Sequence, residues 1–383
     1  MRNLVICHLT SVHPPMDTRI FTKECSSLAG AGYETHLVAP DAPEGVQNGV
    51  RFHSIERGRG RLNRMTKTVR AVYRKALEID ADAYHFHDPE LLPVGLLLKM
   101  KGKKVIYDVH EDVPRQILSK YWIPAPLRKT ISRMFEAFEN FAAKRFDAIA
   151  AATPFISKRF ASIGCHTMYV NNYPLLAEFM APEQDWSRKE HAVTYVGGIS
   201  VNRGIKEMVR AMGHTNATLL LAGKFIPESL RNETTKLAGW EQVNEFGHVS
   251  REEVQQILAR GMAGLVTLHP IINYKDALPV KMFEYMAAGI PVIASDFPLW
   301  REIVEGNECG ICVDPLDEKQ IAEAIQYLVD HPEEAKRMGD NGRRAIEQKY
   351  SWEMEAKKLI AMYEGFEPHS RRTVSLQKRA SSP

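Results

Sequence analysis

Residues 276–296 read DALPVKMFEYMAAGIPVIASD and combine, in one run, the elements that decide the fold. Pro279 suits the first turn of a helix, because its missing N–H has no intrahelical partner there. Gly289 follows the helical stretch and ends it. The apolar run 291–294 then predicts a buried strand. The stretch therefore predicts a helix that leads directly into a strand.

The same alternation of apolar, β-branched runs with helical segments continues along the whole chain, which is typical of parallel sheets with crossover helices. In the first half, strands are predicted at 4–9, 35–39, 51–55, 83–86, 104–108, 148–152 and 168–170. In the second half, they are predicted at 192–196, 217–221, 243–246, 264–267, 291–294 and 310–313. Because the pattern restarts, we predict an α/β protein with two doubly wound, Rossmann-like domains.

The domain boundaries follow from composition. A polar stretch near 175–190 predicts a linker. It separates an N-terminal domain, 1–178, from a C-terminal domain, 190–350. Residues 351–366 predict a C-terminal helix that crosses back to the N-terminal domain, and the basic tail 367–383 predicts disorder. Since doubly wound sheets bind ligands at the carboxyl ends of their strands, we expect the two domains to face a central cleft.

A helix is also predicted over residues 127–145. It carries large apolar side chains at helical spacing, which are Ile131, Met134, Phe135, Phe138 and Phe141. A stripe of this kind is core in most proteins, and we expect it to be buried here.

Composition restricts the class of protein. The 383 residues are 44% hydrophobic and 25% charged, as in globular proteins with ordinary cores. No apolar run is long enough for a transmembrane helix, and residues 1–9 predict a strand and not a secretory signal. Five cysteines form no disulfide framework and favour a reducing cytosol.

The net charge is +3, and the basic excess is densest from Arg51 to Lys75. Its cations are Arg51, Arg57, Arg59, Arg61, Arg64, Lys67, Arg70, Arg74 and Lys75, against the acid Glu56. One interpretation is a solvated surface, and the other is a face that docks on anionic lipid. Nucleic acid is not expected, because no aromatic residue is interleaved before Tyr73.

Several chemistries are excluded by their motifs. The first strand leads into residues 10–15, TSVHPP, and not into a G-x-G-x-x-G turn. Pro14 and Pro15 have no N–H to donate to a pyrophosphate, so a dinucleotide oxidoreductase is disfavoured. No P-loop motif occurs. Cys309 and Cys312 form a lone C-x-x-C inside an apolar strand, for which core packing is expected.

Asp80 and Asp82 imitate the D-x-D pair with which metal-dependent sugar transferases hold a diphosphate. They precede a strand, and so would lie at the wrong edge of the sheet. We therefore predict no metal and no other cofactor. A diphosphate would need Arg, Lys and helix N-termini instead.

The helix predicted within 276–296 supplies such an N-terminus, where N–H groups and a partial positive charge can bind a phosphate. Asp276 precedes this helix and Glu284 lies in its second turn. The first carboxylate would lie near a bound sugar, and the second could accept two hydrogen bonds from a ribose.

These residues resemble the retaining glycosyltransferase family 4, which has the GT-B fold. The resemblance rests on two acids eight residues apart, followed by Ala-Gly289-Ile-Pro-Val-Ile-Ala-Ser295. Where the family commonly has Glu, this chain has Asp276. In the strand and loop 195–204, Gly198 stands where an Arg is common and Arg203 where a Lys is common. Lys281 at the helix start could replace the missing cation, or be an ordinary exposed lysine.

Further matches in the same order extend to about residue 366. They are His13-Pro-x-x-Asp17-x-Arg19, His85-x-His87-Asp-Pro-Glu, Tyr107-Asp108-Val-His110-Glu111, Leu220-Leu-Ala-Gly223-Lys and Phe246-Gly247-His-Val249. They look like a bacterial branch that makes surface polysaccharides. The resemblance implies that the catalytic residues are His110, Asp276 and Arg203. It implies donor contacts by Glu284, Lys281, Gly198, Gly223, Val249, Met282 and Phe283, and substrate contacts by Asp17, Arg19 and His87.

The resemblance thus implies a metal-independent enzyme that moves a sugar from a UDP- or GDP-sugar to a glycan or polyprenyl-linked acceptor with retention of configuration. The N-terminal domain would bind the acceptor and the C-terminal domain the donor. The enzyme would be cytoplasmic, and peripheral at the membrane if the face at 51–75 docks on lipid. The alternatives are a sugar-nucleotide isomerase of the 2-epimerase kind and a non-catalytic sugar-nucleotide-binding protein.

Overall fold

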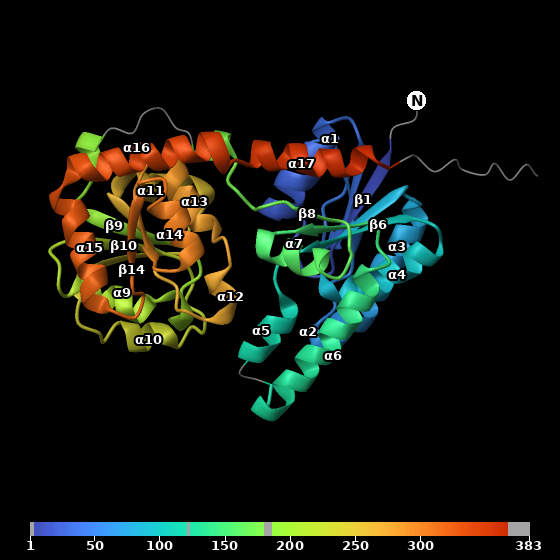
Figure 1. Ribbon diagram of the computed structural model, residues 1–383, viewed down its shortest axis with the longest axis horizontal. Helices are drawn as coiled ribbons and strands as arrows, with labels where there is room; N and C mark the ends of the chain where they lie inside the picture. Colours follow the sequence, from blue (N-terminus) through green and yellow to red (C-terminus); the bar gives the residue numbers. More distant parts are fainter. Residues whose placement is uncertain (1–3, 121–122, 180–185, 367–383) are drawn as a thin grey trace, which may run out of the picture. The chain divides into compact units, whose positions relative to one another are not determined.

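The structure, a computed structural model, describes residues 4–120, 123–179 and 186–366, and these form two α/β sheets with helices around them (Figure 1). The described residues of Met1–Asp108, Phe141–Ile149 and Leu359–Pro383 make one compact unit, and those of Val109–Asn140 and Ala150–Lys358 make the other. The predicted tail, 367–383, and residues 180–185 of the predicted linker lie outside the described residues.

The first sheet has eight strands among the described residues, in the order β3-β4-β2-β1-β5-β6-β7-β8. β1 pairs in parallel with β2 on one side and β5 on the other. The strands are β1 Val5–Leu9, β2 Glu34–Pro40, β3 Val46–Gln47, β4 Val50–Ile55, β5 Ala83–Phe86, β6 Lys104–Val109, β7 Ala148–Ala151 and β8 Thr167–Tyr169. All seven predicted strands are confirmed within two residues. The antiparallel edge strand β3 was not predicted, because its two exposed residues form no apolar run.

The second sheet has six strands within the described ranges, all in parallel, in the order β11-β10-β9-β12-β13-β14. They are β9 Ala192–Val196, β10 Thr218–Ala222, β11 Val243–Gly247, β12 Ala263–Val266, β13 Val292–Ser295 and β14 Gly310–Val313. All six predicted strands are confirmed. Parallel strands covered on both faces read as continuous apolar runs, which is why the sequence located them so closely.

The α-helices of the described residues are α1 Ser26–Gly30, α2 Gly60–Asn63, α3 Val69–Ile79, α4 Leu92–Met100, α5 Val113–Ser119, α6 Ala125–Ala143, α7 Pro154–Ala161, α8 Leu176–Phe179, α9 Ile205–Met212, α10 Leu230–Thr234, α11 Arg251–Arg260, α12 Ile272–Lys275, α13 Val280–Ala287, α14 Pro298–Val304, α15 Glu318–Asp330, α16 Pro332–Lys349 and α17 Trp352–Glu364. Before α1 the chain forms a π-helical segment, η1 Thr18–Cys25. None of these helices is long and apolar enough to cross a lipid bilayer.

The stretch 276–296 folds as a helix and a strand, as predicted. Pro279 is the N-cap of α13, one position before the helix proper. Gly289 has a φ of +68°, and its N–H and that of Ile290 donate to the carbonyls of Met286 and Tyr285 at 3.0 and 3.1 Å. This closing turn leads the chain into β13, which is fully buried.

The C-terminal helix α17 joins the N-terminal elements, as predicted. Its Leu359, Met362 and Tyr363 are buried. The phenol of Tyr363 is 2.7 Å from Nδ1 of His85, which lies in β5 at the centre of the first sheet. The end of this helix, from Leu359 onwards, is therefore part of the core of the first compact unit.

The prediction that the stripe on the helix over 127–145 is core is wrong. α6 forms, but Ile131, Met134, Phe138 and Phe141 are exposed, with Met134 at 69% and Phe141 at 50%. Phe135 alone of the predicted stripe is half-buried. Helical spacing indicates an apolar face but does not say what covers it.

The cysteines are all free thiols. Cys309 is fully buried in the core of the second sheet, as predicted, and Cys312 packs against that core. Burial raises the pKa of the Cys309 thiol to about 12, which suits an unreactive core residue.

Candidate active site

The loop that follows β9 brings a cation to two adjacent glycines. Arg203 donates from Nη1 to the carbonyl oxygen of Gly198 at 2.9 Å, and the hydroxyl of Tyr195 donates to the same oxygen at 2.7 Å. A Cβ on Gly198 would lie 2.6 Å from Arg203 Nη1. Glycine at 198 therefore leaves the space in which the Arg203 guanidinium lies.

Lys281, in the first turn of α13, supplies a second cation at the same loop. Its Nζ lies 3.6 Å from the centre of the Tyr195 ring and 3.2 Å from the position that a Cβ on Gly197 would take. The ammonium atom is buried and has no hydrogen-bond partner among the described residues. Burial and the charge of Arg203 hold the pKa of Lys281 well below its usual range, against the opposing effect of Glu284. Lys281 is thus not an ordinary exposed lysine.

A buried cation without a hydrogen-bonding anion is costly, so this arrangement favours an anionic ligand. The N-terminus of α13 has no side-chain cap. Its first N–H groups and partial positive charge add to the same preference. Thr267 follows β12, and its buried Oγ1 also has no partner among the described residues. The donor set of Arg, Lys, hydroxyl and helix N–H groups is the one by which proteins bind phosphates without a metal.

Glu284 lies in the second turn of α13 and is held by Arg251. Arg251 donates from Nη1 to Oε1 of Glu284 at 2.8 Å and from Nη2 to Oε2 of Glu178 at 2.6 Å. Arg251 is the first residue of α11, which begins with a capping box between Ser250 and Glu253. The side chain of Glu284 is 13% exposed, so its carboxylate remains reachable by a ligand.

Asp276 lies at the C-terminal end of α12, and its side chain is exposed. The loop behind it is fixed by Trp300, whose Nε1 donates to the carbonyl oxygen of Ala277 at 2.7 Å. Asp276, which stands where the family commonly has the longer Glu, therefore lies on a loop that is held in place.

The remaining predicted donor contacts have different environments. Gly223 has a φ of +148°, and a Cβ there would lie 1.8 Å from the carbonyl oxygen of Gly197, so only glycine allows the loops after β9 and β10 to approach. Val249 is half-buried. Met282 and Phe283 are fully buried in the core of the second sheet, so their backbones are the parts available to a ligand.

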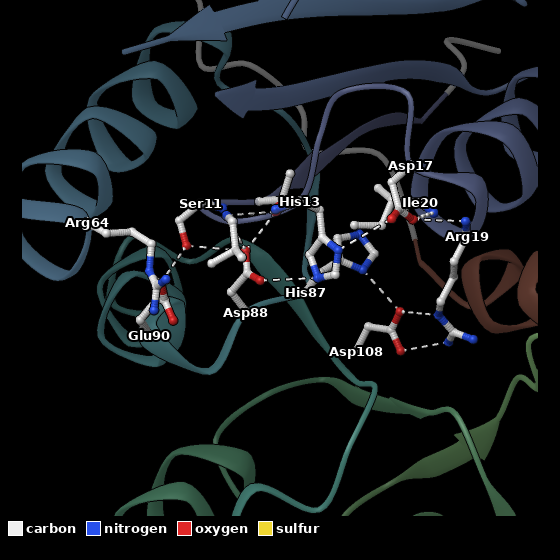
Figure 2. A network of polar contacts seen from close by, with 12 residues as sticks. Ser11, His13, Asp17, Arg19, Ile20, Arg64, His87, Asp88, Glu90 and Asp108 are labelled. Atoms are coloured by element: carbon white, nitrogen blue, oxygen red, sulfur yellow. Dashed lines mark hydrogen bonds and ion pairs between the residues drawn. The ribbon is translucent and has the colours of Figure 1, made fainter. Parts of the chain in front are cut away.

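The first sheet carries a polar network at the carboxyl ends of β1 and β5 (Figure 2). Asp88 accepts hydrogen bonds from Thr10 Oγ1 at 2.7 Å and from the N–H of Ser11 at 2.6 Å. His13 lies between Asp88 and Asp17, with 3.4 Å from a ring nitrogen to each carboxylate. Partial burial opposes protonation of His13, but the two carboxylates outweigh it and raise its pKa above 6.5.

The predicted substrate residues Asp17, Arg19 and His87 lie in the same network. Asp17 caps η1 by accepting from the N–H groups of Arg19 and Ile20, both at 2.9 Å. Arg19 is 5% exposed and binds Asp108 at 2.9 Å and Glu24 at 3.0 Å. His87 is buried, with Nδ1 3.0 Å from Asp108 Oδ2. Figure 2 shows Arg19 and His87 converging on Asp108.

A group of possible metal ligands lies around Arg19. Glu24, His85, His87 and Asp108 are all buried, with donor atoms within 4.8 Å of one another. Arg19 already places its charge between the two carboxylates, so the donor set fits a buried ion-pair network better than a metal. Burial and the neighbouring charge of Asp108 raise the pKa of Glu24 well above its usual range. Asp82 of the D-x-D pair accepts from the N–H of Val5 at 2.9 Å, at the opposite ends of the strands.

His110 lies directly after β6, at the carboxyl edge of the first sheet, and is half-buried. The structure therefore puts Gly198, Arg203, Lys281 and Gly223 around one loop, with Glu284 further along α13. Sequence reasoning missed Tyr195, Arg251, Thr267 and Asp88. Asp88 had a signal, since it follows His87 in the motif His85-x-His87-Asp-Pro-Glu, just after the end of β5.

Two family signatures match the chain. Residues 178–345 match "Glycosyl transferases group 1", and residues 18–167 match "Glycosyl transferase 4-like domain". Among curated proteins, the MMP alpha-(1->4)-mannosyltransferase of Mycolicibacterium hassiacum is 24% identical over 293 residues, 73% of this chain and 69% of that protein.

Solved structures show the same architecture. Sucrose-phosphate synthase from Thermosynechococcus elongatus superimposes with a TM-score of 0.76 at 18% identity, over 94% of this chain and 98% of that one. Anabaena HepE in complex with UDP superimposes with a TM-score of 0.71 at 16% identity, over 94% and 100%. The likenesses show the GT-B fold, and the two family matches, which together cover most of the sequence, show that the chain belongs to the group 1 glycosyl transferases, the retaining, nucleotide-sugar-dependent family 4.

Proposed function

We propose that this chain transfers a sugar from a UDP- or GDP-sugar to a glycan or polyprenyl-linked acceptor in the assembly of a bacterial surface polysaccharide. The observation that carries the proposal is the pair of cations at Gly197 and Gly198. Arg203 and the buried, unpartnered Lys281 Nζ meet there beside the N-terminus of α13. A nucleoside diphosphate supplies the negative charge that this site lacks.

The same groups account for catalysis of bond breaking. The leaving diphosphate gains negative charge as the anomeric bond breaks, and Arg203, Lys281 and the α13 N–H groups stabilise that charge. Because they are fixed before the donor binds, little reorganisation is needed. Removal of one of the two cations should cost about 2–4 kcal/mol of transition-state stabilisation.

Glu284 binds the ribose hydroxyls in this proposal. Arg251 holds one carboxylate oxygen of Glu284, and Oε2 has no hydrogen-bond partner among the described residues. A carboxylate oriented in this way accepts hydrogen bonds from a diol without losing its own support. Gly223 and Val249 line the nucleotide, and the backbones of Met282 and Phe283 complete the donor site.

The remaining predicted residues bind the donor sugar or position the groups around the acceptor. His110 bonds the donor sugar or eases proton movement at the anomeric centre, and Asp276 binds the sugar hydroxyls. Asp17, Arg19 and His87 act as positioning residues, since their polar atoms already bond within the network around Asp108. In this division, residues 1–178 bind the acceptor and residues 190–350 bind the donor.

A peripheral position at the inner face of the plasma membrane suits a lipid-linked acceptor. The basic residues Arg51–Lys75 support it in part, because Arg57, Arg64 and Lys75 are paired with Asp41, Glu90 and Glu78. The other basic residues of this segment supply the positive charge for anionic lipid.

The test is a panel of labelled UDP- and GDP-sugars with and without lipid-linked acceptors. Product should form only with the acceptor present, and Arg203→Ala and Glu284→Ala should each lose most of it. Full activity of both variants would refute the site. Conversion of the donor without an acceptor would favour the isomerase, and tight donor binding with neither transfer nor slow hydrolysis would favour a binding protein.

A further inference from the structure

The exposed face of α6 differs in chemistry from an ordinary surface helix. Five large apolar side chains lie along it at spacings of four and three residues, and together they are called the α6 stripe: Leu127, Ile131, Met134, Phe138 and Phe141. All five are exposed to solvent. Spacings of four and three residues place side chains on one line along a helix, so the stripe is continuous. Continuous exposed apolar surface of this kind marks an interaction site.

Both acids of α6 are paired with arginines of neighbouring helices. Glu139 is fully buried and bound to Arg159, and Glu136 is bound to Arg115. The buried hydroxyl of Ser132 donates to the carbonyl oxygen of Pro114 at 2.7 Å. The helix is thus anchored partly through its polar residues, and its apolar stripe is left outside.

Cations accompany the stripe. Lys129, Arg133, Lys144 and Arg145 are exposed on α6 and the turn that follows it. The Arg145 guanidinium lies 3.6 Å from the centre of the Phe141 ring, so its apolar stem and the aromatic ring share one surface. Residues 125–145 contain no acid other than Glu136 and Glu139. The exposed face of this helix is therefore apolar and positively charged.

We infer that α6 is a lipid-docking helix whose stripe inserts at the head-group boundary of an anionic bilayer, while its cations bind the lipid phosphates. A helix with Leu and Phe on one side and Lys and Arg beside them lies in the plane of such an interface. Each cation near an anionic leaflet adds to the binding.

The charges favour lipid over a second copy of this chain. Pairing two α6 helices through their stripes would bring Arg145 of each copy, which lies over Phe141, close to the other helix, and both acids of α6 are already bound to Arg115 and Arg159. Like charges at a contact oppose association. An anionic bilayer can bury the apolar stripe and neutralise the cations at the same time.

This inference deepens the proposed action on a lipid-linked acceptor, and its test is separate from that of transfer. Sedimentation of the full chain is measured with vesicles of phosphatidylcholine alone and of phosphatidylcholine with phosphatidylglycerol, in the absence of donor. Wild type should bind the vesicles that contain phosphatidylglycerol. Phe138→Ser/Phe141→Ser should weaken that binding about tenfold or more. Tyr327→Ser, which removes an exposed aromatic side chain of α15, should leave it unchanged.

A second variant, Arg133→Gln/Arg145→Gln, should lose preference for phosphatidylglycerol and show a weaker dependence on salt. UDP binding without vesicles, which should be unchanged in every variant, reports on the donor site alone. Wild type that ignores phosphatidylglycerol, or equal binding by the serine variant, would overturn the inference. So would a lipid-free wild-type dimer that the serine variant converts to a monomer, because a second copy would then cover the stripe.

Discussion

Arg251 bridges two carboxylates, since its Nη1 donates to Glu284 Oε1 at 2.8 Å and its Nη2 donates to Glu178 Oε2 at 2.6 Å. The residue proposed to bind the ribose is thus oriented before any donor arrives. Orientation of a ligand-binding carboxylate by a neighbouring cation reduces the freedom that is lost on binding.

Arg251→Gln should raise the KM for the donor about three- to tenfold with a smaller effect on kcat, because loss of one supporting hydrogen bond costs about 0.5–1.5 kcal/mol. Steady-state kinetics with a saturating acceptor measures both constants. Glu178→Gln is the matched control, since it leaves the contact between Arg251 and Glu284 in place. A lower KM in Arg251→Gln would mean that Arg251 competes with the ribose.

Lys281 should take up a proton when the diphosphate binds. Its pKa is held low in the free protein by burial and by Arg203, and the negative charge of the ligand should raise that pKa. Proton uptake is therefore expected at a pH between the pKa of Lys281 in the free protein and its pKa in the complex. This pH lies below the ordinary lysine pKa of about 10.4. Calorimetry of UDP binding in buffers of different ionisation enthalpy measures it. Lys281→Met should abolish the proton uptake. The control variant Lys275→Met, at an exposed lysine, should keep it. If Lys281→Met takes up as many protons as wild type, another group receives the proton.

Gly223 and Gly247 form a matched pair, because the N–H of Gly223 donates to the carbonyl oxygen of Gly247 at 2.6 Å and both have a positive φ. A Cβ on Gly247 would meet no atom within 4 Å, so Gly247→Ala should cost about 1–2 kcal/mol for its left-handed backbone. At Gly223 the Cβ would meet the Gly197 carbonyl, so Gly223→Ala should cost about 3 kcal/mol or more. Urea unfolding compares the two. Similar losses of stability would contradict the predicted close approach of the loops.

His13 should stabilise the fold more at low pH than at high pH. Its pKa is raised in the folded state, so its contribution is fully present below the unfolded value of about 6.5 and is lost as the pH rises through the folded pKa. His13→Asn should therefore destabilise the protein more at pH about 6 than at pH about 8. Melting temperatures of the variant and of wild type at the two values measure the difference. If His13→Asn lowered the melting temperature by the same amount at both pH values, protonation of His13 would not stabilise the fold.

The parallel core was predictable from sequence because strands buried on both faces must be apolar along their whole length. The two-residue β3 carries no such pattern. The α6 stripe shows a different limit of the sequence. Helical spacing correctly predicted that Phe138 and Phe141 lie on one apolar face, but it could not predict that this face is exposed. In the donor site, Lys281 was ambiguous because its burial depends on Tyr195, far away in the chain. Arg251 could not be found at all, since neither its type nor its spacing from Glu284 distinguishes it.

The bond between His85 and Tyr363 has a consequence for synthesis of the chain. The phenol that reaches the buried His85 is translated 278 residues after it. Until then His85 lacks that partner and the surface covered by Leu359 and Met362 stays open to solvent. The centre of the first sheet is therefore completed only long after its own strands have been made.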